Sequence, residues 1–105
     1  MRTLRFIADR QRLSKDPSSD FKSIVAGSVG YLEAEFVTTG DWSGCALVAF
    51  FTDGTVEEYV PVIGNRCVIP SSVLKGKAFM VQLIGTIGDA YKIISTRDII
   101  LQKMR

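Results

Sequence analysis

The feature that most constrains the fold of this chain is a succession of short apolar segments separated by glycine-containing turns. Residues 31–37 alternate apolar and charged side chains, which is typical of a strand with one face in water. Residues 45–52 are apolar on both faces, as expected of a central strand that is covered on both sides. Because no long segment shows helical spacing, the sequence predicts an all-β protein.

Two dipeptides between apolar segments predict β-hairpins. Asp53-Gly54 follows the segment that is apolar on both faces, and Gly64-Asn65 lies between two further apolar stretches. A type I′ turn needs positive φ at both central residues, and pairs of this kind adopt it readily. With a two-residue turn at each place, the three strands would form one sheet. Val62, on the middle strand, would then lie opposite Cys45 on one side and Cys67 on the other.

The predicted elements make one domain, residues 1–105, with the fold of an Ig-like β-sandwich or small barrel. About seven to eight antiparallel strands are expected, with one short helical turn at residues 70–74. Residues 10–22 are polar and are expected to form an exposed loop. The expected strands cover residues 3–9, 31–37, 45–52, 55–62, 66–69, 79–87, 91–96 and 98–103. The side chains expected in the core are those of Leu32, Phe36, Leu47, Ala49, Val60, Val81, Leu83 and Ile93.

The two cysteines are expected to be free and buried. In the three-stranded arrangement they would lie two strands apart, about 9–10 Å at ~4.8 Å per strand. A disulfide needs Cα atoms within about 7 Å of each other. Pro61 does not fit a central strand because it has no backbone N–H, so a bulge or a switch between sheets is expected there.

The composition favours a binding or structural module over an enzyme. The chain has no histidine, which removes the commonest general base and metal ligand. Two cysteines make no metal motif, and we expect no metal and no cofactor. The net charge of +2 is too balanced for a protein that mainly neutralises phosphates, so nucleic acid is not the expected partner. The first ten residues are charged where a signal peptide needs an apolar stretch, and no apolar run approaches the ~20 residues of a membrane span.

For two motifs we favour a structural role over a catalytic or ligand-binding one. Glu57-Glu58 is a carboxylate pair in sequence, but neighbours on a strand point to opposite faces, so it is not expected to form an acid–base dyad. Gly27-Ser28-Val29-Gly30 resembles a phosphate loop only superficially, because it lacks the Gly-Lys-Ser/Thr ending and a following helix. We expect a tight turn there.

The basic N-terminal segment is the first candidate for a partner-binding site. Arg10, Arg12 and Lys15 lie close together in the polar segment, and Phe21 lies where the chain re-enters the sandwich, as a possible apolar anchor. Arginines of this kind make charge-assisted hydrogen bonds to an acidic protein surface. The alternative, that the segment is only a solvated connection, stays open.

Trp42 is the second candidate, for a different class of ligand. A tryptophan at a loop tip, beside Asp41, can stack on a sugar ring. This is the hypothesis that the protein is a carbohydrate-binding module. It can also fold back and plug the end of the sandwich. Since the next apolar strand begins three residues later, we favour the plug.

Several segments together resemble small virion proteins of phages that infect Gram-positive bacteria. The resemblance covers residues 4–102, and Asp41-Trp42-x-Gly44-Cys45 and Cys67-Val68-Ile69-Pro70 are its most distinctive blocks. The other matching segments are Ile24-Val25-Ala26-Gly27-Ser28, Tyr31-Leu32-x-Ala34-x-Phe36, Val48-Ala49-Phe50-Phe51, Val73-Leu74, Gly85 and Tyr91-Lys92-Ile93-Ile94-Ser95-Thr96.

In such proteins an Ig-like or related β-sandwich decorates the head or forms the attachment domain of a head fibre, tail or baseplate component. The resemblance implies a non-enzymatic virion protein that is made in the bacterial cytoplasm. Its partners would be major capsid or tail and baseplate subunits, with homo-oligomers expected. It brings no catalytic residues.

Overall fold

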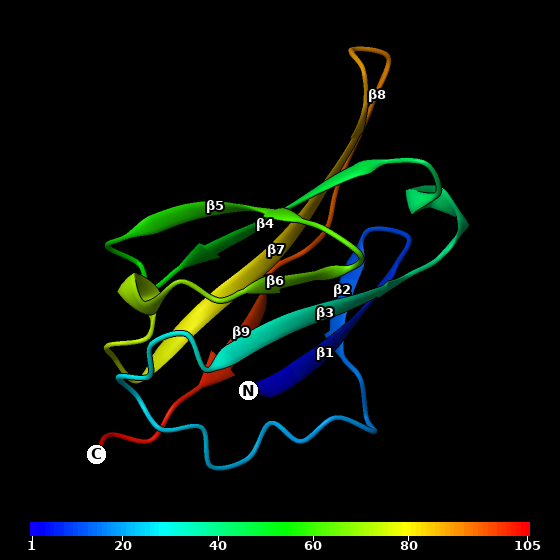
Figure 1. Ribbon diagram of the computed structural model, residues 1–105. Helices are drawn as coiled ribbons and strands as arrows, with labels where there is room; N and C mark the ends of the chain where they lie inside the picture. The colour runs from blue at the N-terminus through cyan, green and yellow to red at the C-terminus, as the bar shows by residue number, and fades with distance from the viewer.

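Nine strands form in the computed structural model, which describes residues 1–105, and they make two sheets that face each other (Figure 1). The first sheet has the order β2 (Arg12–Lys15), β1 (Arg2–Asp9), β3 (Leu32–Thr38) and β6 (Arg66–Val68). The second has the order β5 (Glu57–Val62), β4 (Ala46–Thr52), β7 (Ala78–Ile87) and β8 (Tyr91–Ile94), and β9 (Asp98–Leu101) also pairs with β7. Two 3₁₀ turns, η1 (Gly40–Trp42) and η2 (Ser71–Val73), are the only helical elements. The predicted β-sandwich is confirmed, with nine strands instead of seven or eight and a second helical turn.

The core lies between the sheets and follows from the alternation along each strand. Leu4, Phe6 and Ala8 of β1 are fully buried, and the Phe6 ring stacks on that of Phe36 with 5.6 Å between centroids. Of the eight predicted core residues, six are buried. Leu47 and Val60 are half-buried and pack against the edge of the core.

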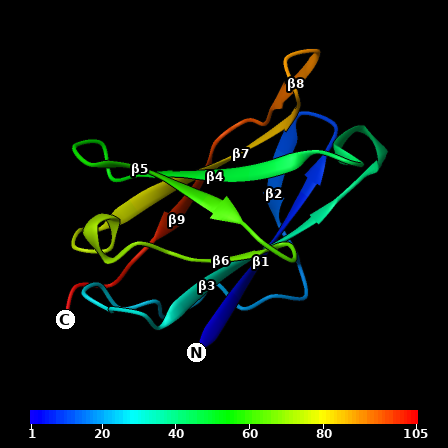
Figure 2. The ribbon, with the colours of Figure 1, turned by 45° about the horizontal axis from the view of Figure 1, so that its top comes forward.

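One pairing departs from the all-antiparallel prediction, because β1 and β3 run parallel. After the β1–β2 hairpin the chain crosses the end of the sandwich through residues 16–31 and enters the sheet on the other side of β1 (Figures 1 and 2). Ile24 and Ala26 of this connection are buried. Ala26 N donates to Lys103 O and Lys103 N to Ile24 O, so the C-terminal segment holds the connection in place.

The prediction of an exposed loop at residues 10–22 is wrong for residues 12–15. These residues form β2, and Leu13 is buried opposite Ala8. The strand has a single apolar residue, which is too little for a period of two to be recognised. Thr96 and Gln11 connect this edge to the second sheet, because Leu13 N donates to Thr96 Oγ1 (3.1 Å) and Thr96 N to Gln11 O (2.7 Å).

The two predicted hairpin turns have different outcomes. Gly64 (φ 60°) and Asn65 (φ 65°) form the predicted two-residue turn, with Ile63 paired to Arg66. At the first turn Thr52 pairs with Glu57, so four residues connect the strands and the predicted register is wrong by two. Asp53 explains the longer turn, since its carboxylate accepts hydrogen bonds from the backbone N–H groups of Thr55 and Val56. A shift of two leaves every side chain on its predicted face.

The predicted three-stranded meander is also wrong, because β6 pairs with β3 of the other sheet. The switch between sheets occurs in the turn at Gly64-Asn65, just after Pro61. Pro61 itself lies on β5, at the edge of its sheet, and it is exposed. A missing N–H is tolerated at an edge.

Both cysteines are free, but only Cys67 is buried as predicted. Burial raises the pKa of the Cys67 thiol to about 12, whereas Cys45 precedes β4 and is half-buried. We expect native protein to react with a thiol reagent at Cys45 first and at Cys67 only after unfolding, since the thiolate is the reactive form. Mass spectrometry of partially labelled protein measures this order. Equal labelling of both residues in native buffer would contradict the burial of Cys67.

Candidate protein-docking surface

The structure divides the four predicted partner-binding residues into two groups. Arg10 and Arg12 are exposed at the tip of the β1–β2 hairpin. Lys15 Nζ donates to Asp98 Oδ2 (2.9 Å) and to Ile99 O (2.7 Å), which holds β2 against β9. The half-buried Phe21 ring packs edge-on against Phe6 at 5.3 Å. The Lys15 and Phe21 side chains therefore contribute to the fold. The Arg10 and Arg12 side chains make no ion pair or hydrogen bond within the molecule, although the Arg10 backbone is bound to Thr39 and Trp42.

Trp42 is not exposed, which removes the basis for sugar stacking at this residue. Its side chain is 2% accessible, and its Nε1–H donates to Arg10 O at 2.8 Å. Asp41 is exposed, and its carbonyl accepts a hydrogen bond from the Tyr91 hydroxyl at 2.7 Å. Trp42 thus plugs the end of the sandwich, as the favoured interpretation predicted.

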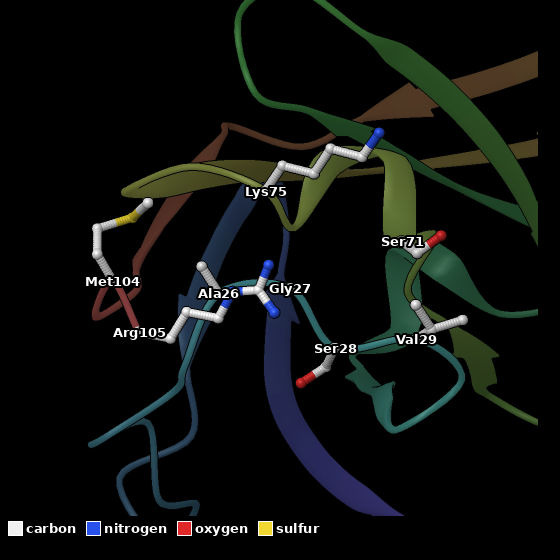
Figure 3. Close-up of a pocket in the computed structure, with 8 residues that line it drawn as sticks. All are labelled: Ala26, Gly27, Ser28, Val29, Ser71, Lys75, Met104 and Arg105. Atoms are coloured by element: carbon white, nitrogen blue, oxygen red, sulfur yellow. The ribbon is translucent and has the colours of Figure 1, made fainter.

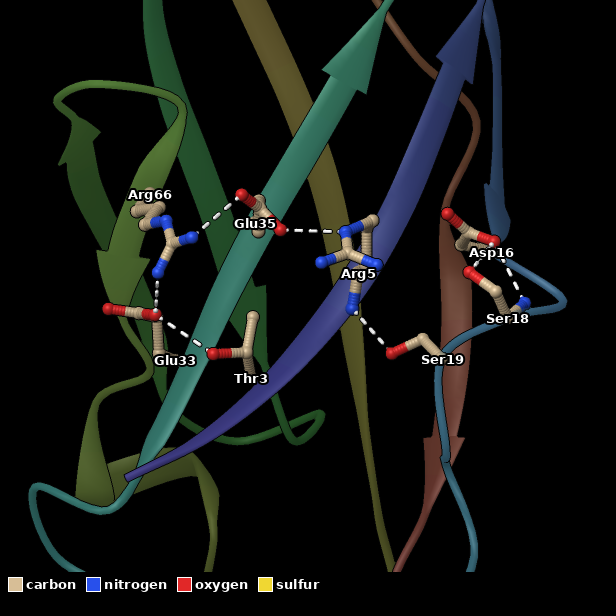
Figure 4. A network of polar contacts seen from close by, with 8 residues as sticks. All are labelled: Thr3, Arg5, Asp16, Ser18, Ser19, Glu33, Glu35 and Arg66. Carbon is tan, nitrogen blue, oxygen red and sulfur yellow. Dashed lines mark hydrogen bonds and ion pairs between the residues drawn. The ribbon is translucent and has the colours of Figure 1, made fainter.

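The outer face of the four-stranded sheet carries charges that satisfy one another (Figure 4). Arg5 Nε lies 2.7 Å from Glu35 Oε1, and Arg66 contacts both Glu33 and Glu35 at 3.0 Å. The Thr3 hydroxyl donates to Glu33 Oε1 at 3.0 Å. With its ionic groups paired within the sheet, this face has little to offer a partner.

Three carboxylates make the folded state sensitive to acid. The hydrogen bond from Arg5 holds the pKa of Glu35 below its ordinary value of 4.5, and backbone N–H donors lower the pKa of Asp16 and Asp53 below 3.8. A carboxylate with a lowered pKa stabilises the fold above its unfolded-state pKa, and this contribution is lost as the pH falls. We expect a constant melting temperature from pH 7 to about 5 and a decline below that, with a shallower decline for Glu35→Gln. A melting temperature independent of pH down to 3 would contradict this.

The outer face of the five-stranded sheet is mostly apolar, with Thr52, Gln82 and Thr86 among its polar members, and no layer covers it. Its exposed members include Tyr59 (65%), Ile99 (53%), Leu101 (71%) and Ile94 (39%). The other apolar side chains of this face are Ala46, Val48, Phe50, Pro61, Ala78, Met80 and Ile84, by their pairing across the strands. We call this set the outer apolar face. A contiguous exposed apolar surface rimmed by polar residues is typical of an interaction site.

The sequence contained the signal for this face, but the interpretation was wrong. Residues 45–52 are apolar on both sides, which predicted a strand covered on both sides. In the structure the core covers only one side of β4, and the other side belongs to the outer apolar face. Phe50 and Thr52 point outward and are buried only by neighbouring side chains of the same face.

An aromatic pair and an arginine lie close together on the outer apolar face. The rings of Phe50 and Tyr59 lie 4.9 Å apart, and the Arg97 guanidinium lies 5.2 Å from the Phe50 centroid. Beside them is a hollow of about 170 Å³, lined by Thr52, Asp53, Ala78, Phe79, Met80 and Ile99. Tyrosine and arginine are residue types that dominate binding energy at protein interfaces.

A larger cavity, of about 380 Å³, lies beside Gly27 (Figure 3). The Arg105 guanidinium lies next to Gly27, but the Lys75 amine and the Ser71 hydroxyl point away from it (Figure 3). Gly27 (φ 98°) lies in a turn and Gly30 (φ 66°) in a bend of the chain before β3. The polar groups do not converge on a common ligand position.

Glu57 and Glu58 lie on opposite faces of β5, as predicted from their positions on one strand. Glu57 is exposed, and Glu58 faces inward, where its carboxylate accepts a hydrogen bond from the Ser72 hydroxyl at 2.7 Å. No three side chains of Cys, Asp or Glu come together as possible ligands of a metal ion. The chain contains no helix with the length and apolar character needed to span a membrane. No protein-family model, curated protein or solved structure matches the chain.

Proposed function

We propose that this protein is a non-enzymatic structural component of a phage virion and that it docks on a neighbouring virion subunit through the outer apolar face. The resemblance of the sequence to small phage virion proteins supports the virion role. The observation that carries the docking mechanism is the contrast between the two sheets. One outer face pairs its charges internally, and the other leaves large apolar side chains in water.

The arrangement of the outer apolar face supports a protein partner. Moving one exposed Ile or Leu side chain from water into an apolar interface gains roughly 1.5–3 kcal/mol. Glu57 and Lys92 lie on edge strands, at opposite corners of the face, while Phe50 lies on β4, inside the sheet. An apolar centre with a charged rim is the usual organisation of a protein interface.

Co-sedimentation with particles that lack the native protein tests this proposal. Tyr59→Thr combined with Ile99→Thr removes two apolar side chains but keeps residues that favour strands. We expect this double variant to retain the wild-type melting temperature within a few degrees and to bind particles about 100-fold more weakly or worse.

The matched control is Arg10→Ala combined with Arg12→Ala, at the tip of the β1–β2 hairpin, where neither side chain belongs to the outer apolar face. It is expected to bind particles like the wild type. Loss of binding in this control, with full binding by the Tyr59 and Ile99 variant, would transfer the docking site to the basic N-terminal segment. Absence of wild-type binding would refute the virion role.

A further inference from the structure

We propose that the partner inserts an apolar side chain into the hollow beside Met80 and sets a carboxylate against Arg97. The partner's contact segment is then an extended stretch that presents an apolar and an acidic side chain on the same side. This inference rests on the proposed docking function and identifies the chemistry of the partner surface.

The hollow is suited to one apolar group. Its volume of about 170 Å³ is close to that of an engineered apolar cavity that binds benzene, roughly 150 Å³. Its two polar side chains already have partners, because the Thr52 hydroxyl accepts from Gly54 N and the Asp53 carboxylate from Thr55 and Val56. Ala78, Phe79, Met80 and Ile99 supply the rest of the lining. The four apolar side chains favour an apolar occupant, which gives up no hydrogen bond with water on entering.

Arg97 is held in position and lacks an anion. Its guanidinium lies over the Phe50 ring, yet none of the ion pairs of the molecule includes it. The carboxylate of the next residue, Asp98, forms an ion pair with Lys15 of β2. A guanidinium has five N–H donors, and its preferred ligand is a carboxylate bound through two of them. Because stacking already restricts the side chain, less conformational entropy is lost when a carboxylate binds.

The two sites are spaced as alternate residues of an extended chain. Thr52, Met80 and Ile99 lie in one row across the sheet, and Phe50, with Arg97 above it, lies in the next. Successive rows on one face of a sheet are about 7 Å apart, the distance between residues i and i+2 of a strand. An apolar residue and an acidic residue at this separation reach both sites.

The charges of the outer apolar face favour a partner protein with a different sequence over a second copy of this chain. The cations of the outer apolar face are Arg97 and Lys92, and its carboxylates are Glu57 and Asp53 of the hollow, of which Asp53 already accepts two backbone hydrogen bonds. In a two-fold dimer whose axis passes near Arg97, the two Arg97 guanidinium groups would face each other. An acidic partner removes that repulsion.

A small probe with both groups tests the inference without the virion. The probe is 3-phenylpropionate, a phenyl ring joined to a carboxylate by two methylenes, and the neutral comparison is 3-phenyl-1-propanol. Binding is followed by backbone amide shifts of the ¹⁵N-labelled protein. We expect 3-phenylpropionate to shift Thr52, Met80, Arg97 and Ile99 and to bind about tenfold more tightly than the alcohol.

Two variants assign the charge. Arg97→Gln is expected to reduce binding of 3-phenylpropionate to the level of the alcohol, and Lys92→Gln, on the same face, is expected to leave it unchanged. An unperturbed amide spectrum elsewhere shows that each variant is folded. Equal binding of the acid and the alcohol, an Arg97→Gln variant that binds like the wild type, or shifts outside these residues would overturn the inference.

The outcome is separate from that of the particle assay. If 3-phenylpropionate binds as expected while wild-type protein does not sediment with particles, the virion role fails and the partner chemistry stands. If particles bind and Arg97→Glu leaves that binding intact, the docking function stands and the carboxylate contact is refuted. Concentration-dependent dimerisation that Tyr59→Thr with Ile99→Thr abolishes would likewise refute the choice of a different chain.

Discussion

Replacement of Leu83 by alanine is expected to lower the free energy of unfolding by about 2–5 kcal/mol. Leu83 has no accessible surface. It lies in the middle of β7, paired with Ala49 of β4, and its side chain belongs to the core between the two sheets. Its backbone N–H is bound to the buried Ser95 hydroxyl, so the strand cannot easily move to fill the cavity. For a domain of this size such a loss is a large fraction of the total stability. Urea denaturation followed by circular dichroism measures it.

Leu47→Ala is the matched comparison, because it makes the same chemical change at a half-buried position on β4. Water reaches this site and neighbouring side chains can relax, so a smaller loss is expected. If both variants unfold at the same urea concentration as the wild type, the assignment of these strands to the core is wrong.

Gly85→Ala is expected to destabilise the fold by about 1–3 kcal/mol through overpacking, and Gly85→Val by more. A Cβ atom at Gly85 would lie 2.9 Å from Trp42 Cε3 and 3.1 Å from both Cys45 Cβ and Ile93 Cγ2. These atoms belong to buried or backbone-anchored groups, so the tryptophan plug must shift to admit a methyl group. Trp42 is the only tryptophan of the chain, and its fluorescence should move to longer wavelength as the ring meets water.

Gly40→Ala provides the control for backbone effects, since Gly40 has no atom within 4 Å of an added Cβ and no positive φ. It is expected to leave both stability and fluorescence unchanged. A Gly85→Ala variant as stable as the wild type, with unshifted emission, would show that Trp42 does not pack against β7.

Local patterns in the sequence predicted the strands well because alternation and turn residues act over a few positions. The turn at Gly64-Asn65 and the inward face of β7 follow from such patterns alone. Which strands become neighbours depends on contacts between distant residues. The pairing of Ala34 with Cys67 across the switch, and the parallel pairing of Phe6 with Phe36, have no local signature.

The candidate docking surface could not be predicted from local sequence patterns either. An apolar pattern states that a side chain avoids water, but it does not state what covers that side chain. Phe50 and Tyr59 therefore looked like ordinary strand residues, and the exposed Arg10 and Arg12 looked more functional. Trp42 was ambiguous for a related reason, since only the position of Gly85 on a distant strand makes room for its ring.

The way the C-terminal segment holds the connection between β2 and β3 has a consequence for biosynthesis. The backbone groups of Ile24 and Ala26 form hydrogen bonds with Lys103. The pairing of β7 with β9 needs residues 98–101. Early segments such as the β1–β2 hairpin can form while the chain is still being translated, but they have no opposite sheet to cover them. The sandwich is therefore complete only after residue 103 has left the ribosome. Folding dominated by such non-local pairings is slow, in the range of milliseconds to seconds, which makes this interval the stage at which chaperones have the most to protect.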